Sequence, residues 1–140
     1  MSSNSEIFKK IQASLQAARD TIKLKDRIED DINDVMSVIP QLTNDAVSFV
    51  ISGNNYDDLS YNACNKIITI TKKSNPYYKF ILCGYSIDEN NGYPVTVETK
   101  HTLTTCADDE NLKLLLTDLI TEKETSMRIV NLISMDDIPF

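Results

Sequence analysis

Residues 77–104 read YYKFILCGYSIDENNGYPVTVETKHTLT, and this stretch decides the fold. Its first part, 77–87, carries apolar side chains on both alternating faces, as a strand in the middle of a sheet does. Residues 88–92 read DENNG, and Asn91 and Gly92 tolerate the positive φ values that a hairpin loop needs. Apolar and polar side chains then alternate over 93–104. We therefore expect a central strand followed by an edge strand with one solvated face.

Two shorter segments precede this hairpin. Residues 46–51 (AVSFVI) are rich in strand-forming side chains and end at a turn-forming SGNN cluster. Residues 67–72 alternate in the same way before Asn75 and Pro76 turn the chain. The whole of 46–104 is then expected to form an antiparallel meander of three to four strands, covered by helices on one face.

The N-terminal segment predicts one long helix over residues 5–39, with Ser5 as its cap and Pro40 as its stop. Such a helix would be about 50 Å long, which exceeds the diameter of a 140-residue globule, so it must break or project. Its apolar side chains recur at spacings of three and four: Ile7, Phe8, Ile11, Leu15, Ala18, Ile22, Ile28, Ile32, Val35, Met36 and Ile39.

The apolar spacing of this helix changes phase at Lys25. Positions 11, 15, 18 and 22 follow one phase, whereas 28, 32, 35 and 39 follow another, and such a slip can separate two packing partners. We expect the second half to lie on the sheet and the first half to contact another chain. The sequence thus predicts a homodimer through the N-terminal helix, although a helix wrapped around its own domain would have the same apolar residues.

Two helices are predicted after the sheet. Residues 108–120 carry a leucine stripe and an acidic first turn. Thr121 and Glu124 have the spacing of a capping box, which predicts a further helix over 122–134. A strand over 127–133 is the alternative, since this segment is rich in β-branched side chains. The inward face of the helix would hold Met127, Val130, Ile133 and Ser134.

These elements predict an α+β fold: a long N-terminal helix, an antiparallel β-meander of three to four strands, and two C-terminal helices packed on one face. We expect a single domain over 1–140, with the long helix in 1–40, the sheet in 46–104 and the helical pair in 108–134. A short acidic and apolar tail, 136–140, follows the last helix.

The composition is that of a globular protein, with 41% of residues apolar and 25% charged. No window approaches the ~20 apolar residues of a membrane span, and the first residues lack the pattern of a secretory signal. Cys64, Cys83 and Cys106 are an odd number without a close pair, which predicts reduced and mostly buried thiols. We expect a cytoplasmic protein that does not contact membranes.

The net charge of −7 is unevenly distributed along the chain. It argues against direct nucleic-acid binding, because phosphates are bound by Lys and Arg. Residues 29–58 carry seven acidic side chains and no basic one, and we call this segment the acidic belt. It predicts a surface for a basic protein partner, although a solvated flank has the same composition. The candidate partner-binding residues are Glu29, Asp30, Asp31, Asp34, Asp45, Tyr56, Asp57 and Asp58.

Catalytic and cofactor chemistry has little support in the sequence. His101 is the only histidine, and it is expected to be half-buried in a strand beside Val97 and Leu103. The three glycines are isolated, so no glycine-rich phosphate loop is possible. His101 and the three cysteines also lack the paired spacing of a zinc site. We expect no catalytic residue, no cofactor and no metal, and hence no enzyme.

By elimination, the leading hypothesis is a non-enzymatic small acidic protein-binding protein, comparable to an immunity protein, an inhibitor or a secretion chaperone. Two alternatives stay open. In one, the acidic surface mimics DNA and occupies a nucleic-acid-binding protein. In the other, a pocket between sheet and helices binds a small molecule or nucleotide, as in a sensor or sponge. An enzyme of unfamiliar type is the remaining reading.

Overall fold

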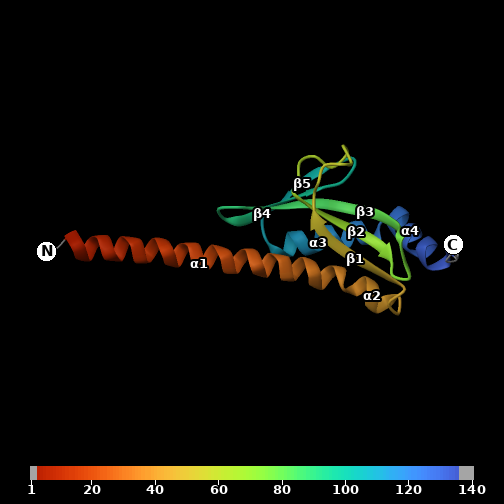
Figure 1. The fold of residues 1–140 in the computed structure, drawn as a ribbon, viewed down its shortest axis with the longest axis horizontal. Coiled ribbons are helices and arrows are strands. Elements are labelled where there is room, and N and C mark those ends of the chain that lie inside the picture. Colours follow the sequence, from red (N-terminus) through yellow and green to blue (C-terminus); the bar gives the residue numbers. More distant parts are fainter. Residues whose placement is uncertain (1–2, 136–140) are drawn as a thin grey trace.

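The computed structural model describes residues 3–135, and these have the α+β fold that the sequence predicts (Figure 1). The predicted tail, 136–140, lies outside the described residues. In chain order the elements are α1 (Ser3–Met36), α2 (Val38–Leu42), β1 (Val47–Gly53), β2 (Lys66–Lys72), β3 (Asn75–Asp88), β4 (Gly92–Glu98), β5 (Leu103–Cys106), α3 (Asp109–Thr121) and α4 (Lys123–Ser134).

The strands form one antiparallel meander in the order β1-β2-β3-β4-β5. The sheet therefore has five strands, and the prediction of three to four was too low. β3 is central, as predicted, and its 14 residues pair with β2 along most of their length. The β3–β4 hairpin pairs Gly84–Asp88 with Gly92–Glu98, so the predicted hairpin is confirmed. Of the two expected turn residues, Gly92 has a positive φ and Asn91 does not.

The predicted strand over 93–104 is in fact two strands, β4 and β5, joined by a tight turn at residues 100–101. Thr99 holds this turn: its backbone N–H donates to the Thr102 carbonyl at 2.9 Å, and its hydroxyl accepts from the Thr102 N–H at 3.0 Å. The turn residues include no Gly, Asn, Asp or Pro, so the pattern gave no turn signal. The sheet consequently ends at Cys106, with β5 as the edge.

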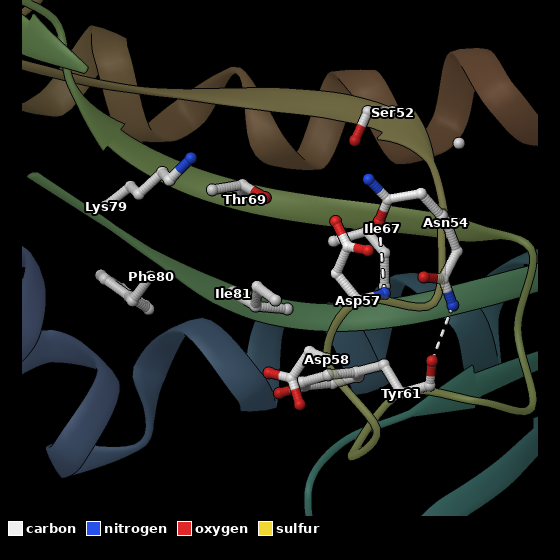
Figure 2. A pocket seen from close by; sticks show the side chains of 12 residues that line it. Ser52, Asn54, Asp57, Asp58, Tyr61, Ile67, Thr69, Lys79, Phe80 and Ile81 are labelled. Atoms are coloured by element: carbon white, nitrogen blue, oxygen red, sulfur yellow. Dashed lines mark hydrogen bonds between the residues drawn. The ribbon is translucent and has the colours of Figure 1, made fainter. Parts of the chain in front are cut away.

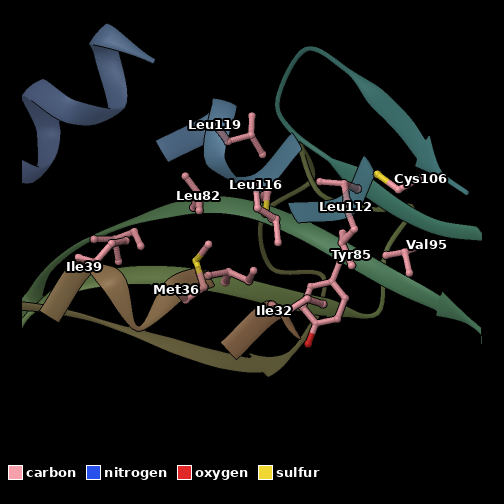
Figure 3. Packing of buried hydrophobic residues seen from close by; sticks show 14 of the residues in the cluster. Ile32, Met36, Ile39, Leu82, Tyr85, Val95, Cys106, Leu112, Leu116 and Leu119 are labelled. Carbon is pink, nitrogen blue, oxygen red and sulfur yellow. The ribbon is translucent and has the colours of Figure 1, made fainter. Parts of the chain in front are cut away.

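The helices contribute buried side chains to one hydrophobic core on one face of the sheet (Figure 3). α1 places Ile28, Ile32 and Met36 there, and α3 adds a stripe of buried leucines. Alternate side chains of the strands complete this core because successive strand residues point to opposite faces. The largest fully buried side chain is Tyr85 of the central strand.

α1 projects from the rest of the molecule, which is one of the two outcomes that its length allowed (Figure 1). Every side chain from residue 4 to residue 20 is exposed, and continuous packing on the sheet and on α3 begins at Leu24. We call residues 3–23 the arm and residues 24–36 the docked part of α1. The two parts belong to one uninterrupted helix.

The end of the predicted long helix differs from expectation. α1 begins at Ser3, before the expected cap at Ser5, and it ends at Met36. Pro40 does not stop a helix but lies inside the short helix α2. Proline is accepted there because its missing N–H falls in the first turn, where N–H groups have no partner within the helix.

The docked part begins where α1 meets the β3–β4 turn. Gly92 has a φ of +80°, and a Cβ at this position would lie 2.9 Å from the Leu24 side chain. The amine of Lys25 donates to the Glu89 carbonyl of the same turn at 3.4 Å. Glycine is thus required at residue 92 both for the backbone conformation and for the close approach of α1.

α3 and α4 confirm the predicted helical pair, and α4 excludes the alternative strand over 127–133. The expected capping box was wrong. The Thr121 hydroxyl donates to the Thr117 carbonyl at 2.8 Å within α3, and no side chain caps α4. Thr121 is the last residue of α3, so its hydroxyl bonds back into the helix that it ends.

The face of α4 that was expected to point inward is exposed. Met127, Val130, Ile133 and Ser134 all lie on the outside, whereas Leu132 is buried, with Ile129 half-buried beside it. α4 carries two apolar stripes, each with spacings of about one turn, and the spacing alone does not say which of them packs on the sheet.

Candidate functional site

Glu29 of the acidic belt is bound within the molecule. Its Oε2 accepts a hydrogen bond from the Tyr85 hydroxyl at 2.6 Å. Burial, then this hydrogen bond and the Glu29 charge, raise the pKa of Tyr85, because each of them disfavours the phenolate. The phenol therefore stays protonated and ties the docked part of α1 to β3. This carboxylate has a structural role.

The other acidic residues of α1 divide between internal and exposed positions. The Asp31 side chain is 16% exposed, and its Oδ1 lies 3.6 Å from the Lys113 amine of α3. Asp30 and Asp34 are exposed and one helical turn apart. Asp45 is also exposed, in the α2–β1 turn, where it has a positive φ. Of the acidic-belt residues on α1, Asp30 and Asp34 are therefore the ones that a partner can reach.

Residues 56–58 lie in the loop between β1 and β2, and Asn54 shapes this loop. The Asn54 amide donates to the carbonyls of Tyr61 and Cys64 at 2.7 and 2.8 Å. Its Oδ1 accepts from the Tyr56 N–H at 2.8 Å. Tyr56 itself has a positive φ and a half-exposed side chain. One side chain thus fixes both ends of the acidic part of the loop.

The loop is held against the outer face of the sheet. Glu98 of β4 is buried, and its Oε1 accepts from the Ala63 N–H at 3.1 Å. Cys64 is fully buried and packs above Gly84 of β3, where an added Cβ would lie 3.2 Å from the Cys64 Cβ. Glycine at residue 84 therefore leaves the space that the loop needs.

A polar hollow of about 370 Å³ lies between this loop and strands β1 to β3 (Figure 2). Asp57, Asp58 and Tyr61 of the loop line it, and Lys79 of β3 lies at its other side. The pKa of the Tyr61 phenol is raised, chiefly by burial and further by the neighbouring Cys83 and Asp58. The hollow thus presents two carboxylates, one ammonium group and a protonated phenol.

The structure divides the acidic belt between the two faces of the sheet. Thr69 lines the hollow, whereas its neighbour Ile70 points into the core that α1 covers. Because successive strand residues point to opposite faces, the loop carboxylates lie on the face opposite the helices. The α1 carboxylates lie on the helical side. The eight candidate residues are therefore not one continuous patch.

The arm is a second candidate surface, and its apolar side chains are uncovered. An exposed apolar stripe of this size is unusual on a monomeric protein, since large exposed apolar patches mark interaction sites. The sequence predicted both the stripe and its separation from the part of α1 that packs on the sheet. Five of its large side chains are more than half exposed: Ile7, Phe8, Ile11, Leu15 and Ile22.

A smaller apolar stripe on α4, formed by Met127, Val130 and Ile133, was missed from the sequence, because those residues were assigned to the core. The hollow was also missed. Asn54 was recognised only as part of a turn cluster, and its long-range hydrogen bonds leave no local signal in the sequence.

His101 and the three cysteines differ in exposure. His101 lies exposed in the β4–β5 turn, so its predicted half-buried position in a strand was wrong. Cys64, Cys83 and Cys106 are buried free thiols, as predicted. Burial raises the pKa of all three, that of Cys83 to about 12, so the reactive thiolate is disfavoured.

Within residues 3–135, no three or more His, Cys, Asp or Glu side chains are grouped so that they could hold a metal ion. None of the helices in this part combines the length and apolar character needed to cross a membrane. No protein-family model, curated protein or solved structure matches the chain.

Proposed function

We propose that this chain is a non-enzymatic protein-binding protein that engages a basic partner protein and self-associates through α1. The observation that carries the proposal is the uncovered apolar stripe of the arm, on a helix that continues into the core. Immunity proteins, inhibitors and secretion chaperones are proteins of the kind that we have in mind. Three buried free thiols support a reducing compartment, and we propose the cytoplasm.

Charge indicates the chemistry of the partner. The arm carries four basic and two acidic side chains, for a net charge of +2. The rest of the described chain, 24–135, carries ten basic and seventeen acidic side chains, for −7. A protein with a basic surface would be attracted to this body, and its association rate would fall as salt is added.

Charge reversal tests the basic partner. The variant carries Asp30→Lys, Asp34→Lys and Asp57→Lys, three exposed sites of the acidic belt. The matched control reverses three exposed acidic residues outside the belt, with Glu110→Lys, Asp118→Lys and Glu122→Lys. We expect a basic protein captured from the native host to associate on the order of 10-fold more slowly with the triple variant at low salt. A partner that binds wild type, triple variant and control equally would contradict the proposal.

The polar hollow favours a second candidate function, the binding of a small polar molecule. Its volume lies within the usual range of ligand sites, but two carboxylates against one ammonium group disfavour phosphate-bearing ligands such as nucleotides. A screen of small amines and polyols by thermal unfolding tests it, with Asn54→Ala as the variant that disturbs the loop. Ligand at 100 times its Kd should stabilise the wild type by about 2.7 kcal/mol.

The DNA-mimic alternative stays a prediction. It requires two rows of carboxylates at phosphate-like spacing on one surface. The division of the acidic belt between the two faces of the sheet gives it no support.

A further inference from the structure

The arm presents its apolar side chains as a regular seam. Phe8, Ile11, Leu15, Ala18 and Ile22 follow one another at alternating spacings of three and four, the pattern by which two helices pair in a coiled coil. All five are exposed. The next position of this pattern is Lys25, whose amine bonds to the β3–β4 turn, so the seam ends where docking begins.

The body of the same molecule does not cover this seam. At 100° per residue, the seam lies roughly a quarter-turn to a third of a turn away from the side that Leu24, Ile28 and Ile32 press onto the core. The seam therefore lies on a different side of α1 from the side that packs on the core, and the arm extends away from the sheet (Figure 1). Between Ile11 and Ile22 a second helix can lie along it without displacing any part of the body.

We propose that the occupant is the arm of a second copy, running antiparallel, with Phe8 of each copy opposite Lys25 of the other. This inference rests on the proposed self-association and adds its geometry. In this register Ile11 meets the partner's Ile22, and Leu15 meets the partner's Ala18. The two bodies then lie at opposite ends of a shared two-helix rod.

Side-chain size favours this direction over the parallel one. A parallel pair in register would place Ala18 against the partner's Ala18 and Phe8 against the partner's Phe8, which leaves one layer underfilled and crowds another. The antiparallel register places a large side chain against a small one at Leu15 and Ala18, and equal side chains at Ile11 and Ile22. Layers of even volume pack without gaps, as protein interiors require.

Charge favours the same direction. A parallel pair would set the two Lys25 side chains against each other at one end of the seam. The antiparallel register places each Lys25 opposite the uncharged Phe8 of the other copy instead. Like charges therefore do not meet within the seam.

Distances between labels on the two copies distinguish the directions. A spin label on Asn4→Cys reports the ends of the rod, because residue 4 aligns with residue 29 of the partner in the antiparallel register. The two labels would then be separated by about 37 Å along the rod, against about 10 Å between the axes of a parallel pair. A label on Ala17→Cys lies near the middle, on the outer side of each arm, and reports a distance of about 20 Å in either case.

The native thiols do not compete for the label, since Cys64, Cys83 and Cys106 are buried, and the unlabelled wild type checks this. A mixture of Leu15→Cys and Ala18→Cys molecules supplies a second measurement. We expect it to form the mixed disulfide faster than either variant forms a disulfide with itself. Ile11→Asp is the control that should abolish the short Ala17 distance while leaving the body folded.

A long distance at residue 4 together with a short one at residue 17 supports the antiparallel rod. Short distances at both positions overturn the direction and leave self-association standing. A monomer in sedimentation velocity at 100 μM, roughly the concentration of the labelling experiment, overturns this inference and the proposed self-association together. The basic partner would then have to be judged from the charge-reversal experiment alone.

Discussion

The two parts of α1 have the same apolar spacing and opposite surroundings. In the docked part, Ile28 is fully buried against β-strands and α3, whereas in the arm Phe8 is 67% exposed. The spacing predicts a helix with an apolar side in both cases. The spacing does not show which surface covers this apolar side. In the docked part the sheet and α3 cover it, whereas in the arm no part of the same molecule does.

The boundary between the two parts is set by a few contacts rather than by the helix itself. Leu24 packs on Gly92, and Lys25 bonds to the turn that follows β3. The change of apolar phase falls at the same position. From Leu24 onward, where packing on the sheet begins, a different side of the helix therefore carries the apolar residues.

The largest expected difference between the two parts comes from deleting a buried side chain. Ile28→Ala should lower the free energy of unfolding by about 3 kcal/mol, because it leaves a cavity in the core. Ile11→Ala, its match in the arm, should change it by less than about 0.5 kcal/mol in the monomer. Urea unfolding at a protein concentration below that of self-association measures both. Equal losses would show that the arm is packed after all.

Gly92→Ala should sharpen the boundary between arm and docked part. We expect a loss of about 2 kcal/mol, because alanine is strained at a φ of +80° and its Cβ would press on Leu24. Gly53→Ala is the control, since a Cβ there meets nothing within 4 Å. Urea unfolding of the two variants makes the comparison, and a loss at Gly53 as large as at Gly92 would contradict this account.

Tyr85→Phe should loosen the docked part without creating a cavity. The lost hydrogen bond to the Glu29 carboxylate is worth about 1.5 kcal/mol, as bonds to charged groups are. Tyr77→Phe is the control, because that side chain is 90% exposed. Hydrogen exchange of the amides in 24–36 should speed up in Tyr85→Phe and stay unchanged in Tyr77→Phe. Unchanged exchange in both would remove the role assigned to Glu29.

Alkaline pH should weaken the docked part through the same tyrosine. The pKa of Tyr85 is raised in the folded protein above the ordinary value of 10.0, so unfolding favours the phenolate once the pH passes 10. The stabilisation is present below pH 10, and it should fall by about 1.4 kcal/mol per pH unit above it. Between about pH 9 and pH 11, one unit either side of the ordinary tyrosine pKa, the free energy of unfolding of Tyr85→Phe should fall less than that of the wild type. Urea unfolding measures both. Parallel declines would contradict the assignment.

The smallest effect is expected from the ion pair between Asp31 and Lys113. The two atoms lie 3.6 Å apart and the Lys113 side chain is 47% exposed, so a double-mutant cycle of Asp31→Asn and Lys113→Met should give a coupling of about 0.5 kcal/mol. Raising the salt concentration should reduce it. A coupling several times larger would mean that electrostatics, rather than apolar packing, holds the docked part in place.

Most of the fold could be predicted because its signals are local. The leucine stripe of α3, the alternation in β4 and the DENNG loop each report an element within a few residues. The class, the central place of β3 and the helical pair followed from them. The break between β4 and β5 could not be predicted, because a threonine hydroxyl closes that turn where glycine or asparagine is usual.

The candidate surfaces were harder to predict because they depend on contacts between distant residues. The sequence places Glu29 and Asp57 in one acidic belt, yet one binds Tyr85 of β3 and the other lies across the sheet in the loop. α4 has two apolar stripes, and only the one with Leu132 is buried while Val130 is exposed. Which stripe is buried depends on the sheet surface on which α4 packs. Sequence spacing carries no information about either outcome.

In the monomer, the difference in charge between the arm and the rest of the described chain gives the molecule an electric dipole. The arm carries +2 and the rest of the described chain −7, and the arm extends the distance between the two charges well beyond the width of the body. A dipole of this kind experiences a torque in the field of a charged neighbour, so the molecule would rotate before it touches anything. A cationic surface would meet the sheet and loops first, with the helix trailing behind and pointing away.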